Sequence, residues 1–237
     1  MKRIVALIFI MIVSFNAYAT RDHFFLIGSP GAGKGTFTQF LNDHGTYVHL
    51  CLGDILRSEI ARDSEIGIKI KSIVAAGKLV PNEIMFKLFE EQFVLALQGD
   101  KKIIVDGMLQ SAEHIQFFDH LLDKHKLRDN FNFVYLSVPR YLAKKRLLSR
   151  LVCNSCNHVT NTEFCVDQKC PKCGHKITMR IDDQLQAIDK RLDRFYDQVL
   201  PLVKLYEKRA GFIEHDNSKE YLLRVAEYKK SYFTDGH

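Results

Sequence analysis

Apolar and polar positions alternate along the chain in a way that predicts strands separated by helices. Short apolar runs at residues 24–27, 47–51, 103–105, 131–138 and 211–215 predict five strands. Apolar residues at helical spacing predict helices at residues 34–43, 53–62, 65–76, 82–98, 112–125, 140–150, 183–209 and 219–230. Because strands and helices alternate, we expect an α/β fold, with a five-stranded parallel sheet flanked by helices.

One segment, residues 151–178, lacks helical periodicity and separates two long predicted helices, so we expect an insert there. The 237 residues suffice for one domain with such an insert or for two small domains. A hydrophobic content of 46% with 26% charged residues is ordinary for a soluble globular protein. A net charge of +6 suits phosphate-bearing ligands but is weak evidence for nucleic acid, and we expect no nucleic-acid partner.

The first nineteen residues have the pattern of a signal peptide. Lys2 and Arg3 precede an apolar run that is too short to span a bilayer comfortably, and Ala17-Tyr-Ala19 supplies the small residues of a cleavage site. We therefore predict a signal peptide at residues 1–19, transient membrane contact, and an exported or periplasmic mature chain that begins at Thr20. An uncleaved anchor, a misassigned start codon and a cytoplasmic location are the alternatives.

A glycine-rich turn, Gly28-Ser-Pro-Gly-Ala-Gly-Lys-Gly-Thr36, stands between the first predicted strand and helix. Glycines let the backbone wrap closely around anionic oxygens, so that N–H groups and a helix N-terminus point at a phosphate. Lys34 adds a positive charge at that phosphate. The general phosphate-binding loop has Ser or Thr directly after the lysine, whereas this chain has Gly35 followed by Thr36.

Four of the six cysteines form two pairs, Cys153-x-x-Cys156 and Cys170-x-x-Cys173. Two residues between thiolates let both sulfurs reach one tetrahedral ion, so we predict a structural zinc site rather than disulfides or free thiols. Four protein thiolates leave no open position for catalysis. Cys51 is expected to be a buried strand residue. Cys165 is close enough to Cys170 that a swapped ligand stays open.

The Gly-Lys-Gly-Thr ending is characteristic of nucleoside monophosphate kinases, and the chain resembles the adenylate kinase family from about residue 24 to 219. The resemblance rests on the turn above and on Leu52-Gly-Asp-Ile-Leu-Arg57, Ala76-Gly-Lys-Leu-Val-Pro81, Val105-Asp-Gly107, Arg180-Ile-Asp-Asp183, Arg191-Leu192, Pro201-Leu202 and Asp216-Asn-Ser-Lys219. It implies a P-loop kinase domain at residues 20–237, with a helical monophosphate-binding insert at 51–80 and a zinc-bound lid at 150–182. It also implies a monomer that uses ATP, Mg²⁺ and structural Zn²⁺.

The resemblance also implies roles for single residues. Lys34, Asp106, Arg146, Arg150, Arg180 and Arg191 would be catalytic, with Asp106 orienting water around Mg²⁺. ATP would contact Gly31, Ala32, Gly33, Lys34, Gly35, Thr36, Arg150, Val159, Thr160 and Lys219. The acceptor nucleotide would contact Leu52, Arg57, Lys78, Leu79, Val80, Gly107, Gln110, His114, Arg180 and Arg191. Asp182 and Asp183 would be a lid hinge and a lid contact.

The acceptor side departs from the family pattern. Where the family has Phe-Pro-Arg-Thr, this chain has Met108-Leu-Gln-Ser111, so Gln110 replaces an arginine that contacts the monophosphate. His114 replaces the glutamine that reads adenine, and Leu52 replaces a threonine. We expect the reaction ATP + AMP = 2 ADP. A kinase for another nucleoside monophosphate and a catalytically degenerate ATP-binding pseudoenzyme are the alternatives.

Overall fold

The structure, a computed structural model, describes residues 21–42, 45–156, 158–162, 168–219, 226–228 and 232. The predicted signal peptide, Cys165 and most of the helix predicted at residues 219–230 lie outside these residues. Within the described part, no helix combines the length and the apolar character that a membrane crossing requires.

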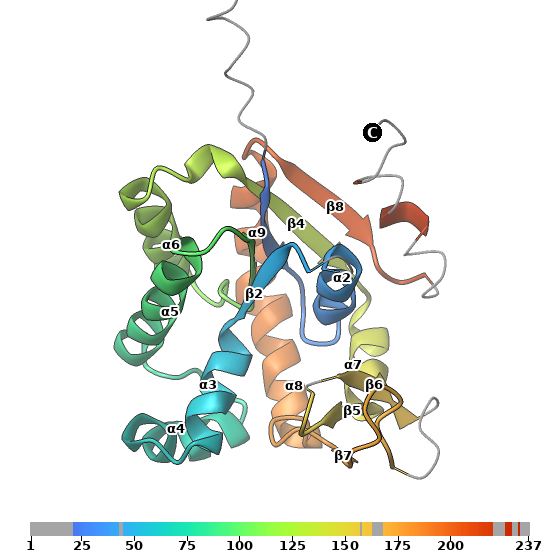
Figure 1. Ribbon diagram of the computed structural model, residues 1–237. Coiled ribbons are helices and arrows are strands. Elements are labelled where there is room, and N and C mark those ends of the chain that lie inside the picture. The colour runs from blue at the N-terminus through green and yellow to red at the C-terminus, as the bar shows by residue number, and fades with distance from the viewer. Residues whose placement is uncertain are drawn as a thin grey trace, which may run out of the picture.

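Five parallel strands form the centre of the fold, in the order β2-β3-β1-β4-β8 (Figure 1). Their bounds are β1 His23–Ile27, β2 Tyr47–Cys51, β3 Lys102–Asp106, β4 Phe131–Ser137 and β8 Phe212–Asp216. The predicted parallel sheet is confirmed, and the strand ends differ from the prediction by no more than one residue. Because β1 and β3 are neighbours, with Leu26 paired to Asp106, the glycine-rich turn after β1 lies beside the end of β3.

Helices cover both faces of this sheet, as predicted. Their bounds are α2 Lys34–Leu41, α3 Leu52–Ala61, α4 Glu65–Ala75, α5 Asn82–Leu97, α6 Ala112–Lys124, α7 Arg140–Leu148, α8 Leu185–Arg194 and α9 Leu200–Glu207, with a 3₁₀ turn at Arg128–Asn130. Phe25 and Ile27 of β1 pack on one face in a core that α5, α6 and α9 complete. Phe24 and Leu26 pack on the other face with residues of α2, α7 and α8. Alternate residues of β1 therefore pack into two separate hydrophobic cores, one on each face of the sheet.

The prediction of one uninterrupted helix at residues 183–209 is wrong. α8 begins at Leu185, and a π-helical turn, Phe195–Val199, separates it from α9. Proline has no N–H to donate, so Pro201 cannot bond the carbonyl of Asp197 four residues earlier. The helical bonding widens in the turn before Pro201, where Phe195 and Val199 remain buried in the core.

Two smaller units extend from the end of the sheet at which β2 stops (Figure 1). One contains α3 and α4, which approach so closely at Gly67 that a Cβ there would lie 2.1 Å from the carbonyl oxygen of Glu59. The other is an antiparallel sheet of β6 Val159–Asn161, β5 Arg150–Cys153 and β7 Ile177–Thr178, in that order. This small sheet occupies the segment in which the sequence lacks helical periodicity.

Candidate active site

A cavity of about 1100 Å³ is bordered by the glycine-rich turn, the α3–α4 unit and the small sheet. Most residues that the resemblance implicates line it, and Ala32, His114, Asp183 and Lys219 do not. Those that line it are Gly31, Gly33, Lys34, Gly35, Thr36, Leu52, Arg57, Lys78, Leu79, Val80, Asp106, Gly107, Gln110, Arg146, Arg150, Val159, Thr160, Arg180, Asp182 and Arg191. The fold thus brings together residues that are up to about 160 positions apart in the sequence.

The glycine-rich turn is held in the shape of an anion cradle. Gly31 has a φ of +81°, and a Cβ there would lie 2.5 Å from the carbonyl oxygen of Ala143, so only glycine fits. The Lys34 ammonium donates to the carbonyl oxygens of Gly28 at 2.9 Å and Ser29 at 3.1 Å. Burial lowers the pKa of Lys34, and the nearby Asp106 carboxylate opposes that shift. These hydrogen bonds join the lysine to the turn at the start of α2.

Asp106 is the last residue of β3 and is only 6% exposed. Its Oδ1 lies 3.8 Å from Lys34 Nζ, which is an ion-pair distance but too long for a hydrogen bond. Burial favours the neutral carboxyl, but Lys34, His49 and Arg180 together outweigh burial and hold the pKa of Asp106 below its usual value. Oδ1 is buried and has no hydrogen-bond partner among the residues that the structure describes. An ionised, unsatisfied oxygen suits Mg²⁺ or the water that Mg²⁺ carries.

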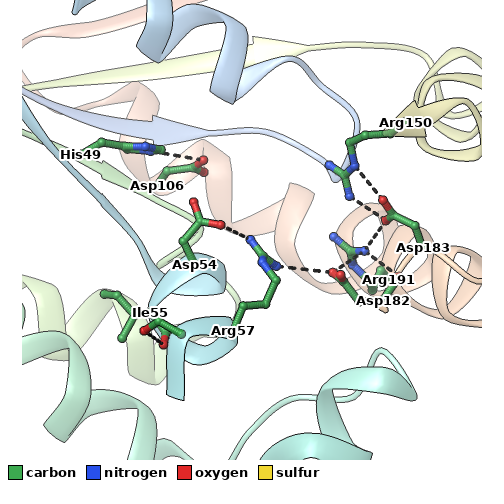
Figure 2. Close-up of polar contacts among 10 residues, drawn as sticks. His49, Asp54, Ile55, Arg57, Asp106, Arg150, Asp182, Asp183 and Arg191 are labelled. Atoms are coloured by element: carbon green, nitrogen blue, oxygen red, sulfur yellow. Dashed lines mark hydrogen bonds and ion pairs between the residues drawn. The ribbon is translucent and has the colours of Figure 1, made fainter. Parts of the chain in front are cut away.

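Two aspartates hold two of the arginines at the cavity wall (Figure 2). Arg150 donates from Nε and Nη2 to both carboxylate oxygens of Asp183, at 2.7 and 2.6 Å. Arg191 Nη1 donates to Asp183 Oδ1 at 3.1 Å and lies 2.8 Å from Asp182 Oδ2. Asp183 is fully buried, so the pairs are shielded from water. A guanidinium has five N–H donors, and those left free stay available to a phosphate.

The other arginines approach the cavity from different elements. Arg57 of α3 donates to Asp54 at 2.5 Å and lies 3.7 Å from Asp182 Oδ2, which links the α3–α4 unit to the segment after β7. Arg146 of α7 donates to the carbonyl oxygen of Asn217 at 2.8 Å. Burial, together with repulsion from Arg57 and Arg150, lowers the pKa of Arg180 to about 10. Arg180 stays charged at neutral pH, and its Nε is buried with no hydrogen-bond partner in the described part of the chain.

On the acceptor side, the loop after β3 is closed by its own hydrogen bonds. Gln110 lines the cavity, and its Nε2 donates to the carbonyl oxygen of Gly107 at 3.1 Å. His114 is 1% exposed; its Nε2 lies 3.0 Å from Asn82 Oδ1 and its Nδ1 lies 3.1 Å from the N–H of Gln110. His114 therefore lies behind the loop and ties it to α5, away from the cavity wall where the sequence placed it.

Two other predicted contacts also lie off the cavity wall. Lys219 pairs with Glu227 on the surface. Ala32 is fully buried, and its carbonyl oxygen accepts a 2.7 Å hydrogen bond from Asn217 Nδ2. The sequence did not predict that Asn217 holds the glycine-rich turn in place, although the motif Asp216-Asn-Ser-Lys219 that contains it was part of the family resemblance. It also missed Arg194, which lines the cavity and donates to the carbonyl oxygen of Gly77, because only its place on α8 brings it there.

The four paired cysteines converge on one point of the small sheet. Sγ–Sγ distances are 3.4 Å for Cys153–Cys173, 3.6 Å for Cys156–Cys170 and 3.3 Å for Cys156–Cys173. Tetrahedral zinc with bonds of about 2.3 Å needs sulfurs about 3.8 Å apart, whereas a disulfide needs about 2.05 Å. The two pairs lie on two turns of the same kind. In the first turn the N–H of Cys153 donates to the carbonyl oxygen of His158, and in the second the N–H of Cys170 donates to the carbonyl oxygen of His175. The cluster fits a structural Zn²⁺.

Comparison with known proteins gives the family. A model of the adenylate kinase family matches residues 26–211 of this chain. The chain belongs to the adenylate kinase family. Among its relatives, the adenylate kinase of Mycoplasmopsis pulmonis is 32% identical over 88% of this chain and 98% of its own length. The adenylate kinase of Borreliella burgdorferi is 30% identical over 86% of this chain and 93% of its own. The adenylate kinase of Moorella thermoacetica is 32% identical over 82% of this chain and 90% of its own length.

Membership of the adenylate kinase family agrees with the chemistry of the cavity. The family reaction is the reversible transfer of the terminal phosphoryl group of ATP to AMP, which yields two ADP. ATP and Mg²⁺ take part in this reaction, and the four-cysteine cluster adds a structural zinc in this chain. The protein is accordingly a phosphotransferase that binds nucleotides.

Proposed function

We propose that this adenylate kinase holds ATP beside the glycine-rich turn and AMP beside α3, with the phosphoryl group passing between them. The observation that carries this assignment is the convergence of Lys34, Arg146, Arg150, Arg180 and Arg191 on one cavity. Phosphoryl transfer asks a protein mainly for positioning and for positive charge around the transferred group. Lys34 and the backbone N–H groups at the start of α2 would hold the ATP phosphates, and the arginines would stabilise the group in transit.

The arginines are supported for this role by the way they are held. Arg150 and Arg191 cannot swing freely, because the buried Asp183 binds both. Charges that are oriented before the reaction need no reorganisation during it, which is the condition for strong electrostatic stabilisation. Asp106 would orient the water around Mg²⁺, and the ion, when bound, would neutralise phosphate charge.

AMP is the acceptor that we assign, and its phosphate site carries less charge than the cavity's ATP side. Arg57 and Lys78 supply positive charge there, while Gln110 is neutral and bonds its own loop. Losing a charge-assisted contact costs about 1.5–3 kcal/mol. Leu52, which is 4% exposed, adds an apolar wall, so another nucleoside monophosphate is a second candidate acceptor.

A coupled assay that offers ATP with AMP, GMP, CMP and UMP in turn tests the assignment. We expect the highest kcat/KM with AMP. A higher kcat/KM with another monophosphate would transfer the assignment to that acceptor, and tight ATP binding without transfer to any of the four would refute an active kinase.

We infer that residues 51–80 and 150–182 are two covers that close over the nucleotides. Both line the cavity, and Arg57 of the first lies 3.7 Å from Asp182 of the second. Closure excludes water, which otherwise competes as phosphoryl acceptor. Spin labels on the exposed Ile68 and Lys172 should move closer when ATP and AMP are added together. An unchanged distance distribution would contradict closure.

We also infer that residues 1–19 are removed on export and that the mature protein is a monomer. Export is supported by the basic start, the apolar run and Ala17-Tyr-Ala19. The monomer is what membership of the adenylate kinase family leads us to expect. Mass spectrometry should find Thr20 at the N-terminus, and light scattering should give the mass of one chain. An intact chain that begins at Met1 in the cytoplasm would refute export.

A further inference from the structure

Two side chains at the floor of the cavity have no part in the roles assigned above. His49 and Cys51 belong to β2 and are two positions apart, so both project from the same face of the strand. Cys51 pairs in register with Asp106 on the neighbouring parallel strand β3. The sheet register therefore gathers an imidazole, a thiol and a carboxylate. Cys51, expected from the sequence to be buried, is partly exposed and lines the cavity.

The three groups have the spacing of metal ligands. One ligand atom from each of His49, Cys51 and Asp106 lies within 4.8 Å of the others. Some point therefore lies within about 2.8 Å of all three atoms, against zinc bond lengths of about 2.0–2.3 Å, so shifts of up to about 0.8 Å complete the bonds. Side-chain rotation at the end of a strand supplies movements of this size.

Two of the three groups carry a polar atom that has no hydrogen-bond partner among the described residues. His49 Nε2 and Asp106 Oδ1 are both buried and unpartnered. Asp106 Oδ2 lies 3.8 Å from His49 Nε2, which exceeds hydrogen-bond distance, although the two side chains face each other (Figure 2). Buried polar atoms are ordinarily satisfied, and orphaned atoms that point at one place indicate a missing ligand.

We propose that His49, Cys51 and Asp106 bind a transition-metal ion such as Zn²⁺, and that this ion inhibits phosphoryl transfer. Imidazole and thiolate select zinc, cadmium or cobalt over Mg²⁺, which prefers oxygen. Three protein ligands leave a fourth position open toward the cavity, unlike the closed four-cysteine cluster. Coordination replaces the thiol proton of Cys51 with the metal and releases that proton to solvent.

Inhibition follows from the position of Asp106. Its Oδ1 now lies 3.8 Å from Lys34 Nζ and is free to orient the water of Mg²⁺. A bound zinc would occupy that carboxylate and place two positive charges next to Lys34. The inhibitory part of this inference rests on the proposed role of Asp106, whereas the binding part does not.

Zinc titration of the full protein tests both parts. Equivalents bound are counted by competition with a chromophoric chelator, and kinase activity is followed at constant Mg²⁺. We expect two equivalents, with the second one inhibiting. Cys51→Ser should lose one equivalent and raise the zinc concentration for half-inhibition at least tenfold, and His49→Asn should do the same. Cys156→Ser is the matched control: it should lose the equivalent of the four-cysteine cluster and keep the cavity equivalent.

The outcomes separate the two parts. Loss of the second equivalent in both cavity variants supports the site whatever the activity shows, so a failure of the proposed kinase roles would remain distinguishable. A wild-type protein that binds only one equivalent, or cavity variants that keep the second, would overturn the site. A second equivalent that leaves activity unchanged would overturn the inhibition. If Cys51→Ser does not fold, as judged by its melting transition, His49→Asn decides alone.

Discussion

Gln110→Arg is the substitution that examines the acceptor side most directly. Gln110 lines the cavity, and its side-chain amide donates a 3.1 Å hydrogen bond to the carbonyl oxygen of Gly107. An arginine there would lose that neutral bond, worth about 0.5–1.5 kcal/mol, and gain a charge-assisted contact with the monophosphate, worth about 1.5–3 kcal/mol. The midpoints of these ranges differ by about 1.25 kcal/mol, which corresponds to roughly an eightfold increase in kcat/KM for the acceptor.

The assay is steady-state kinetics with saturating ATP and each monophosphate in turn. Gln110→Met is the matched control, because it removes the same hydrogen bond without adding charge, and it should not raise kcat/KM. The KM for ATP should change less than about twofold in both variants, since the ATP side is untouched. If Gln110→Arg leaves kcat/KM unchanged or lower for AMP, GMP, CMP and UMP, residue 110 does not face the acceptor phosphate.

Three further predictions concern the rest of the site. Asp183→Asn should destabilise the protein by about 3–5 kcal/mol and lower kcat, because it leaves Arg150 without its buried carboxylate and Arg191 with Asp182 alone; an unchanged Tm would contradict this. Cys170→Ser should remove about one equivalent of zinc and lower Tm more than Cys165→Ser does, and equal effects would argue against the ligand assignment. The pKa of Asp106 is depressed, so its contribution to stability is present above its unfolded value of 3.8 and is lost as pH falls through the lower folded value. Wild-type stability should therefore fall more steeply below pH 3.8 than that of Asp106→Asn.

The sequence by itself determined the features that depend on local pattern. Apolar runs of strand length placed the five strands to within a residue, because burial on both sides of a parallel sheet demands continuous apolar segments. The glycine-rich turn was readable because only glycine tolerates the φ of Gly31 and the approach of Ala143. The zinc cluster was predictable from the sequence because two residues between paired cysteines, on a tight turn, place both sulfurs of a pair where they can bind one ion.

The tertiary structure alone decided which side chains share the cavity. His114 and Lys219 fit a sequence motif, yet one packs behind its loop and the other pairs on the surface. Arg194 enters the cavity although no motif marks it, because α8 passes along the cavity wall. Cys51 meets Asp106 through the register of β2 on β3, and these residues are 55 positions apart. Such pairings follow from how elements pack and which strands are neighbours, and spacing along one segment carries no information about either.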